Sequence, residues 1–107
     1  MGKSWIGVDL DKTLAYQKTH EWKGPDVIGR PIPQMLMRVK GWIKEGKKVK
    51  IFTARVKHGQ EAIDAIQDWC ESVGLPRLDV VNEKDHDMIC LWDDRVRRVE
   101  PNTGREM

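Results

Sequence analysis

The sequence predicts an α/β fold, a Rossmann-like three-layer sandwich on a mostly parallel sheet, in a single domain spanning residues 1–107. Three observations support this prediction. Short apolar runs alternate with helical patterns, an order that is typical of parallel sheets. Polar and charged residues follow each apolar run directly, as at the strand ends where open α/β sheets bind ligands. The length of 107 residues suffices for one core and leaves no room for a cap domain of ordinary size.

The first predicted strand is the run Trp5–Val8, which is apolar on both faces, as buried parallel strands are. Asp9 and Asp11 follow at its carboxyl end with one residue between them. If the backbone stays extended, this spacing turns both carboxylates to the same side. The alternative is that the two acids only begin a polar turn after the strand.

Residues 15–30 have no helical period and carry turn signals at Gly24-Pro25 and Gly29. We interpret this stretch as a short flap over the end of the first strand. We expect three of its side chains to face a substrate, with the alternative for the tryptophan that it only holds the flap to the body of the protein. They are Tyr16, His20 and Trp22.

Two helices and three further strands are predicted along the rest of the chain, and residues 96–100 are a candidate for a last strand. Apolar residues at steps of three and four indicate one helix after Pro33 that ends at Gly46, and another from Gln60 to Gly74. The strands are Val49–Phe52, Leu78–Val81 and Met88–Trp92. Lys50 is awkward in a fully buried strand, which indicates that one face of the sheet is only partly covered. Residues 82–87 form a shorter link than a parallel crossover normally needs.

Composition bears on the cellular setting more than on the activity. The 19 basic and 17 acidic side chains give a net charge of +2, too small by itself to indicate nucleic acid or an anionic membrane. Cys70 and Cys90 lie in apolar patterns, as free thiols in a reducing compartment do. No signal peptide or membrane span is recognisable. We therefore expect a cytoplasmic protein without a membrane partner.

Four acids follow the first and last strands and should meet at one edge of a parallel sheet. They are Asp9, Asp11, Asp93 and Asp94. Carboxylates gathered in this way raise one another's pKa, and a bound divalent cation removes the repulsion. Oxygen atoms of the first pair and of one or both members of the second pair suit Mg²⁺. No cysteine or histidine cluster indicates zinc.

Three residues near the ends of the inner strands complete the predicted site. Thr53 offers a hydroxyl group, while Arg55 and Lys84 offer positive charge. These groups would bind a phosphoryl group placed beside the metal ion.

The order of these motifs resembles that of the haloacid dehalogenase-like hydrolase superfamily over nearly the whole chain. Residues 9–14 (Asp-Leu-Asp-Lys-Thr-Leu) are similar to its first motif, although the family often has glycine at the position of Lys12. The matches to its second, third and fourth motifs are Thr53, Lys84 and Asp93-Asp94. Small capless members, often phage-associated, and the phosphatase domain of polynucleotide kinase/phosphatase enzymes are the most similar in these motifs.

The resemblance implies a Mg²⁺-dependent phosphatase that hydrolyses phosphomonoesters through an aspartyl-phosphate. Asp9 would be the nucleophile and Asp11 the general acid and base. An open site without a cap suits a nucleotide or a nucleic-acid end phosphate, but the sequence leaves the phosphorylated substrate and the oligomeric state open. Two alternatives remain: a receiver-like phosphoacceptor signalling module, which normally carries its phosphoacceptor after a later strand, and a non-catalytic binding module on the same fold.

Overall fold

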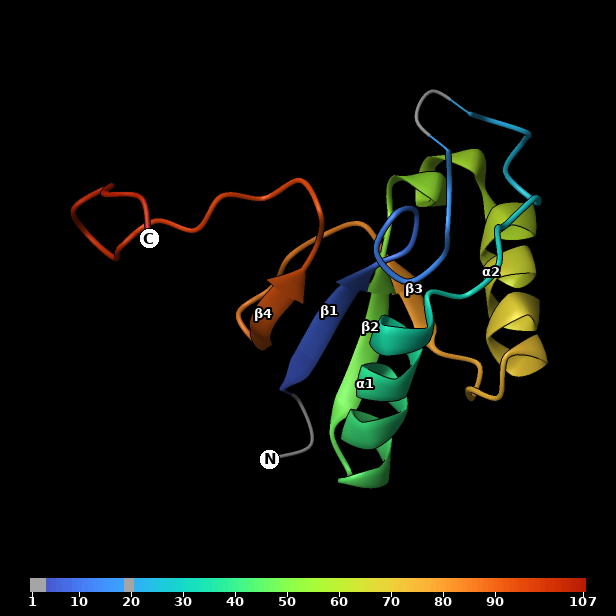
Figure 1. Cartoon of the computed structure of the whole chain (residues 1–107), viewed down its shortest axis with the longest axis horizontal. Coiled ribbons are helices and arrows are strands. Elements are labelled where there is room, and N and C mark those ends of the chain that lie inside the picture. The colour runs from blue at the N-terminus through green and yellow to red at the C-terminus, as the bar shows by residue number, and fades with distance from the viewer. Residues whose placement is uncertain (1–3, 19–20) are drawn as a thin grey trace.

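The computed structural model describes residues 4–18 and 21–107 (Figure 1). Within these residues, the strands are β1 (Trp5–Asp9), β2 (Lys48–Phe52), β3 (Asp79–Val81) and β4 (Met88–Trp92). The helices are α1 (Pro33–Lys44), the 3₁₀ helix η1 (Ala54–His58) and α2 (Gln60–Ser72). The strands form one sheet in the order β3-β2-β1-β4, and all neighbouring pairs are parallel. The predicted α/β class and its parallel sheet are confirmed.

Both α-helices pack on the same face of the sheet. Successive side chains of a strand point to opposite faces, so alternate residues of β1 and β2 form this face. Its buried members are Ile6, Val8, Val49 and Ile51. The helices add Met35 and Val39 from α1 and Ile66 and Cys70 from α2 to the same apolar cluster. The hydrophobic core therefore lies between the sheet and the two helices.

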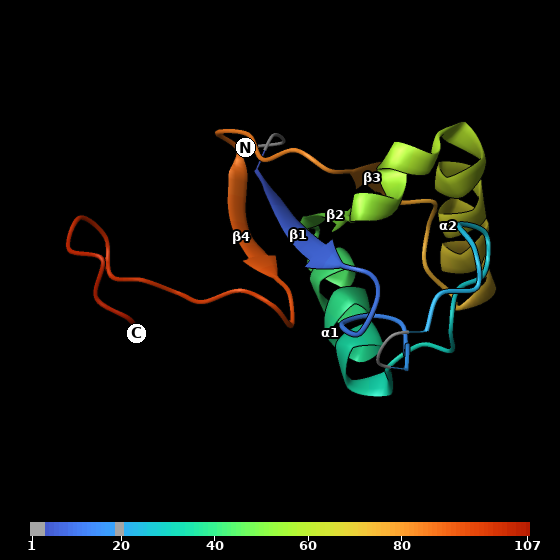
Figure 2. The ribbon, with the colours of Figure 1, turned by 90° about the horizontal axis from the view of Figure 1, so that it is seen from above.

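The link 82–87, which has no helix or strand, crosses the other face of the sheet. Figure 2 shows this link passing on the side of the sheet opposite to α1. Trp5 anchors it: the Trp5 backbone N–H donates to the Asp87 carbonyl at 3.0 Å, and the indole Nε1 donates to Asp85 Oδ1 at 2.8 Å. Lys50 Nζ lies 4.6 Å from the centre of the Trp5 ring and is half-buried. The prediction that the face at Lys50 is only partly covered is thus confirmed.

No helix in the described ranges 4–18 and 21–107 is long and apolar enough to cross a membrane. Both cysteines are free thiols, Cys70 in the core and Cys90 exposed on β4.

Candidate active site

The carboxyl ends of β1 and β4 bring three acids together. The two strands are neighbours, with Val8 beside Trp92, so Asp9 at the end of β1 lies next to the residues that follow β4. One carboxylate oxygen from each of Asp9, Asp93 and Asp94 lies within 4.8 Å of the other two. Asp9 and Asp93 are partly buried and Asp94 is exposed. We call these three residues the acid triad.

The electrostatics of the acid triad favour a bound cation. The pKa of Asp9 is raised to about 7, most by burial and then by the neighbouring Asp93 and Asp94 carboxyls, against a smaller lowering by the Thr13 hydroxyl. A divalent cation in place of the proton relieves this repulsion. Because the donor atoms are carboxylate oxygens, the residues fit a hard cation such as Mg²⁺.

Thr13 joins two members of the acid triad and was not among the predicted site residues. Its Oγ1 lies 3.2 Å from Asp9 Oδ2 and 3.1 Å from Asp94 Oδ1, and it accepts the backbone N–H of Asp94 at 3.1 Å. The hydroxyl has one proton and can donate to only one carboxylate at a time. The signal in the sequence was a hydroxyl residue four positions after Asp9, in the turn that follows the strand.

A tight turn after β1 directs these side chains. The Leu10 carbonyl accepts the N–H groups of Leu14 at 2.9 Å and Ala15 at 2.8 Å, while the Lys12 N–H donates to the Ala15 carbonyl at 2.8 Å. Leu10 and Leu14 are fully buried and hold the turn on the core. Lys12 adopts a positive φ of 71°, the left-handed conformation for which glycine is better suited.

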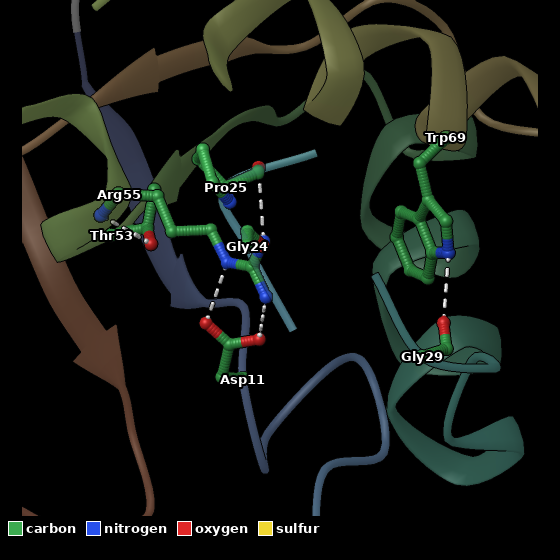
Figure 3. Close-up of polar contacts among 7 residues, drawn as sticks. All are labelled: Asp11, Gly24, Pro25, Gly29, Thr53, Arg55 and Trp69. Atoms are coloured by element: carbon green, nitrogen blue, oxygen red, sulfur yellow. Dashed lines mark hydrogen bonds and ion pairs between the residues drawn. The ribbon is translucent and has the colours of Figure 1, made fainter. Parts of the chain in front are cut away.

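Asp11 lies outside the acid triad, and Arg55 binds its carboxylate (Figure 3). Arg55 Nε donates to Asp11 Oδ2 at 2.9 Å and Nη2 donates to Oδ1 at 2.8 Å. The expectation that one-residue spacing turns Asp9 and Asp11 to the same side holds only in part, since both line one cavity but have different partners. The reason is that β1 ends at Asp9 and the turn begins at Leu10.

The flap is held to this ion pair. Arg55 Nη1 donates to the Pro25 carbonyl at 3.0 Å and to the Gly24 carbonyl at 3.4 Å. Arg55 Cζ also lies 4.8 Å from the centre of the Trp22 ring, and that ring stacks on His58 at 5.5 Å. Trp22 thus holds the flap to the body, and because it also lines the large cavity, its contact with a substrate stays a prediction. His20 lies outside the described residues.

Thr53 stands at the end of β2, as predicted, and begins η1. Its Oγ1 accepts the backbone N–H of Arg55 at 3.1 Å, and the side chain is 3% exposed. The hydroxyl proton remains for a further acceptor. Lys84 is an exposed residue of the link 82–87 and does not line the cavity at the strand ends. The predicted contact of Lys84 with a phosphoryl group therefore stays a prediction.

A cavity of about 920 Å³ opens at these strand ends. The predicted site residues in its lining are Asp9, Asp11, Thr53, Arg55, Asp93 and Asp94. Lys12, Lys57 and Arg95 add positive charge to the lining. The cavity therefore places clustered carboxylates and several cations around one volume, which is the charge pattern that a metal ion and a phosphoryl group together require.

Comparisons with known proteins bear on the fold. No protein-family model matches the chain, and no curated protein matches it. One solved structure does. It is that of a conserved protein coded by a locus from Bacteroides thetaiotaomicron, with a TM-score of 0.62 and 24% sequence identity, covering 86% of this chain and 76% of that one. At this level of identity the similarity concerns the fold alone.

Proposed function

We propose that the chain is a Mg²⁺-dependent phosphatase of the haloacid dehalogenase-like type, which hydrolyses phosphomonoesters through an aspartyl-phosphate. One observation carries the proposal: a carboxylate oxygen of Asp9, at the end of a central strand, lies within 4.8 Å of carboxylate oxygens of Asp93 and Asp94. All three residues line a large cavity. The motif order in the sequence supports the same reading. Without a cation, a proton on Asp9 is what relieves the repulsion among the three carboxyl groups, as its raised pKa of about 7 indicates.

The acid triad would hold the metal ion, together with the predicted carbonyl of Asp11. When bound, Mg²⁺ would keep Asp9 ionised and neutralise charge on the phosphoryl oxygens. The Thr13 hydroxyl supports this role, because it lies within hydrogen-bond distance of Asp9 and Asp94 and restrains whichever carboxylate accepts its proton.

The chain's own groups divide the reaction between them. An Asp9 carboxylate oxygen attacks phosphorus, the bond from phosphorus to the leaving oxygen breaks, and Asp11 gives that oxygen a proton. In the second half, Asp11 takes a proton from a water molecule, which attacks the phosphorus and frees Asp9 and inorganic phosphate. The cations in the lining and the Thr53 hydroxyl would stabilise the phosphoryl oxygens.

The size of the cavity bears on the substrate. A volume of about 920 Å³ exceeds what a phosphoryl group needs and accommodates a bulky leaving group. A nucleotide or a nucleic-acid end phosphate fits this volume and the cationic lining. We also propose a cytoplasmic location, which the two free thiols support, since thiols persist in reducing compartments.

The first test is release of phosphate from p-nitrophenyl phosphate, with and without Mg²⁺, by wild type and Asp9→Asn. An amide cannot attack phosphorus, so we expect Mg²⁺-dependent turnover that falls about 10³-fold or more in the variant. Asp79→Asn is the matched control, because Asp79 is an exposed acid of β3 outside the cavity.

Other outcomes favour the alternatives. Turnover in Asp9→Asn close to that of wild type would contradict the assignment of the nucleophile. A long-lived phosphoryl group on Asp9 without turnover would indicate a receiver-like module. Binding of phosphorylated ligands without either reaction would indicate a binding module.

A further inference from the structure

The guanidinium group of Arg55 is almost fully used by contacts within the protein. Its side chain is 4% exposed and makes four hydrogen bonds, two to the Asp11 carboxylate and two to the flap carbonyls of Gly24 and Pro25. Arginine has five N–H donors, so these bonds leave one. The Trp22 ring lies against the guanidinium, with its centre 4.8 Å from Cζ. Little of the group is left to meet a substrate.

We propose that Arg55 is a positioning residue, which sets the direction of the Asp11 carboxylate and is itself held by the flap backbone. The inference rests on the proposed function, in which Asp11 transfers protons. In this role Arg55 contacts the Asp11 carboxylate, and the predicted contact of Arg55 with phosphate is given up. With both oxygens accepting from Arg55, Asp11 has to release one of these bonds before it can donate a proton to a leaving group.

The space around Asp11 explains why such a group is needed. Asp11 and Arg55 line the large cavity and also a second cavity, of about 210 Å³, beneath the flap. The Asp11 side chain is 22% exposed, so packing alone does not select a direction for its carboxylate. The two bonds from Arg55, at 2.8 and 2.9 Å, supply that selection. A bidentate pair is well suited to this because it fixes both the position and the plane of the carboxylate.

The flap that supplies these carbonyls is also held at its base. At the base of the flap, the Tyr16 N–H donates to the Arg30 carbonyl at 2.7 Å. Trp69 of α2 donates its Nε1–H to the Gly29 carbonyl at 3.0 Å (Figure 3). The flap is therefore tied to the body at Gly29 and, through Arg55, at Gly24 and Pro25. A chain of contacts runs from the flap backbone through Arg55 to Asp11.

The two roles of Arg55 are separated by steady-state kinetics of Arg55→Lys and Arg55→Gln. A lysine keeps the charge but cannot form the bidentate pair. If Arg55 positions Asp11, kcat should fall about 10²-fold in both variants, while the inhibition constant of inorganic phosphate changes less than about twofold. Arg77→Lys is the matched control, since Arg77 pairs with Asp68 and Glu71 on exposed surface away from the cavity.

A second variant tests whether Arg55 acts through Asp11. In the Asp11→Asn background, Arg55→Gln should lower kcat little further, because the group that it positions is already gone. Independent losses in the double variant would overturn the proposal. So would a rise of about tenfold or more in the inhibition constant of phosphate with kcat retained, since that pattern belongs to a phosphate ligand.

Hydrogen exchange of the flap amides gives a readout that does not depend on turnover. We expect exchange in residues 21–30 to rise at least about tenfold in Arg55→Gln and also to rise in Asp11→Asn, because each removes a link of the same chain of contacts. Unchanged exchange in both variants would overturn the positioning role. Raised exchange in both, in a protein without phosphatase activity, would support the positioning of Asp11 and show that only the proposed function had failed.

Discussion

Asp9 and Asp11 are near neighbours in sequence but have different environments. Asp9 lies among acids, with its pKa raised to about 7 by burial and by Asp93 and Asp94. Asp11 lies against a buried guanidinium, with a bond to each of its oxygens. Two carboxyl groups in contrasting surroundings are a common basis for dividing nucleophilic and proton-transfer roles. Without a cation these surroundings favour the protonated form of Asp9, so its proposed role as nucleophile depends on Mg²⁺ bound at the acid triad.

Lys12, between these two acids, offers a stability test at the residue scale. A side chain at a φ of 71° costs about 1–2 kcal/mol, and glycine removes this strain at an entropic cost of about 0.5–1 kcal/mol. Lys12→Gly should therefore raise the free energy of unfolding by about 0.5–1 kcal/mol, measured by urea denaturation. Asn102→Gly replaces a residue with a similar φ of 68° in the segment that follows β4, which contributes nothing to the core, and should leave the global stability unchanged. A loss of stability in Lys12→Gly would mean that the lysine side chain stabilises the turn.

At the scale of elements, the flap is held by close backbone packing as well as by Arg55. A Cβ atom on Gly29 would lie 1.8 Å from the Tyr16 carbonyl oxygen, so only glycine permits this approach of the two ends of the flap. Ala15 and Pro31 pair as an antiparallel bridge beside it. The flap therefore has a fixed base, which explains how a stretch with so little regular structure can present the carbonyls that hold Arg55.

Alanine at two glycine positions tests this description of the flap. Gly29→Ala should lower the free energy of unfolding by about 2 kcal/mol and speed proteolytic cleavage of the flap, because backbone atoms have to move. Gly41→Ala is the control: Gly41 is an exposed residue of α1, and a Cβ there meets nothing within 4 Å. Alanine should stabilise that helix by up to about 1 kcal/mol. Equal behaviour of the two variants in denaturation and proteolysis would contradict the tight base of the flap.

For the whole molecule, the parallel sheet concentrates negative charge at one edge. The helices cover one face of the sheet and the link 82–87 crosses the other (Figures 1 and 2). The acid triad lies where β1 and β4 end, in the wall of the large cavity. The protein accordingly carries a local destabilising charge that a cation can relieve. Stability, pH and metal binding should then be linked through Asp9.

This linkage predicts the direction of a pH effect. Folded Asp9 has its pKa raised from 3.8 to about 7, so between these values the folded state binds a proton that the unfolded chain has lost. Without metal, the loss of the Asp9 proton should therefore lower the free energy of unfolding as pH rises from 3.8 to about 7. After allowance for solvent screening, this decrease should be about 2 kcal/mol at most. Mg²⁺ should raise Tm more at pH 8 than at pH 5, because at the lower pH it competes with the proton.

Thermal denaturation in EDTA and in Mg²⁺ at the two pH values measures both effects. Asp9→Asn should remove this pH dependence and weaken the response to Mg²⁺, since the amide neither titrates nor offers a charged ligand. Equal stabilisation by Mg²⁺ at pH 5 and pH 8 would argue against the linkage.

The positions of strands, helices and strand-end residues followed from local patterns in the chain. Helical periodicity located α1 and α2, and the apolar runs located β1 to β4, because burial on one or both faces imposes a pattern on neighbouring residues. The parallel topology predicted that Asp9 lies near Asp93 and Asp94, because parallel strands end at the same edge of a sheet. The acid triad confirms this proximity. The flap was located by its turn signals and its lack of period.

What only the tertiary structure decided is which groups meet across the chain. Arg55 binds Asp11, 44 positions away, and Trp5 binds Asp85, 80 positions away. Lys84 lies outside the cavity that Lys12, Lys57 and Arg95 help to line. Local sequence determines backbone conformation and burial, because these depend on near neighbours. The partner of a charged side chain depends on distances of a few ångströms between distant segments, and these are set only when the core between the sheet and its helices has packed.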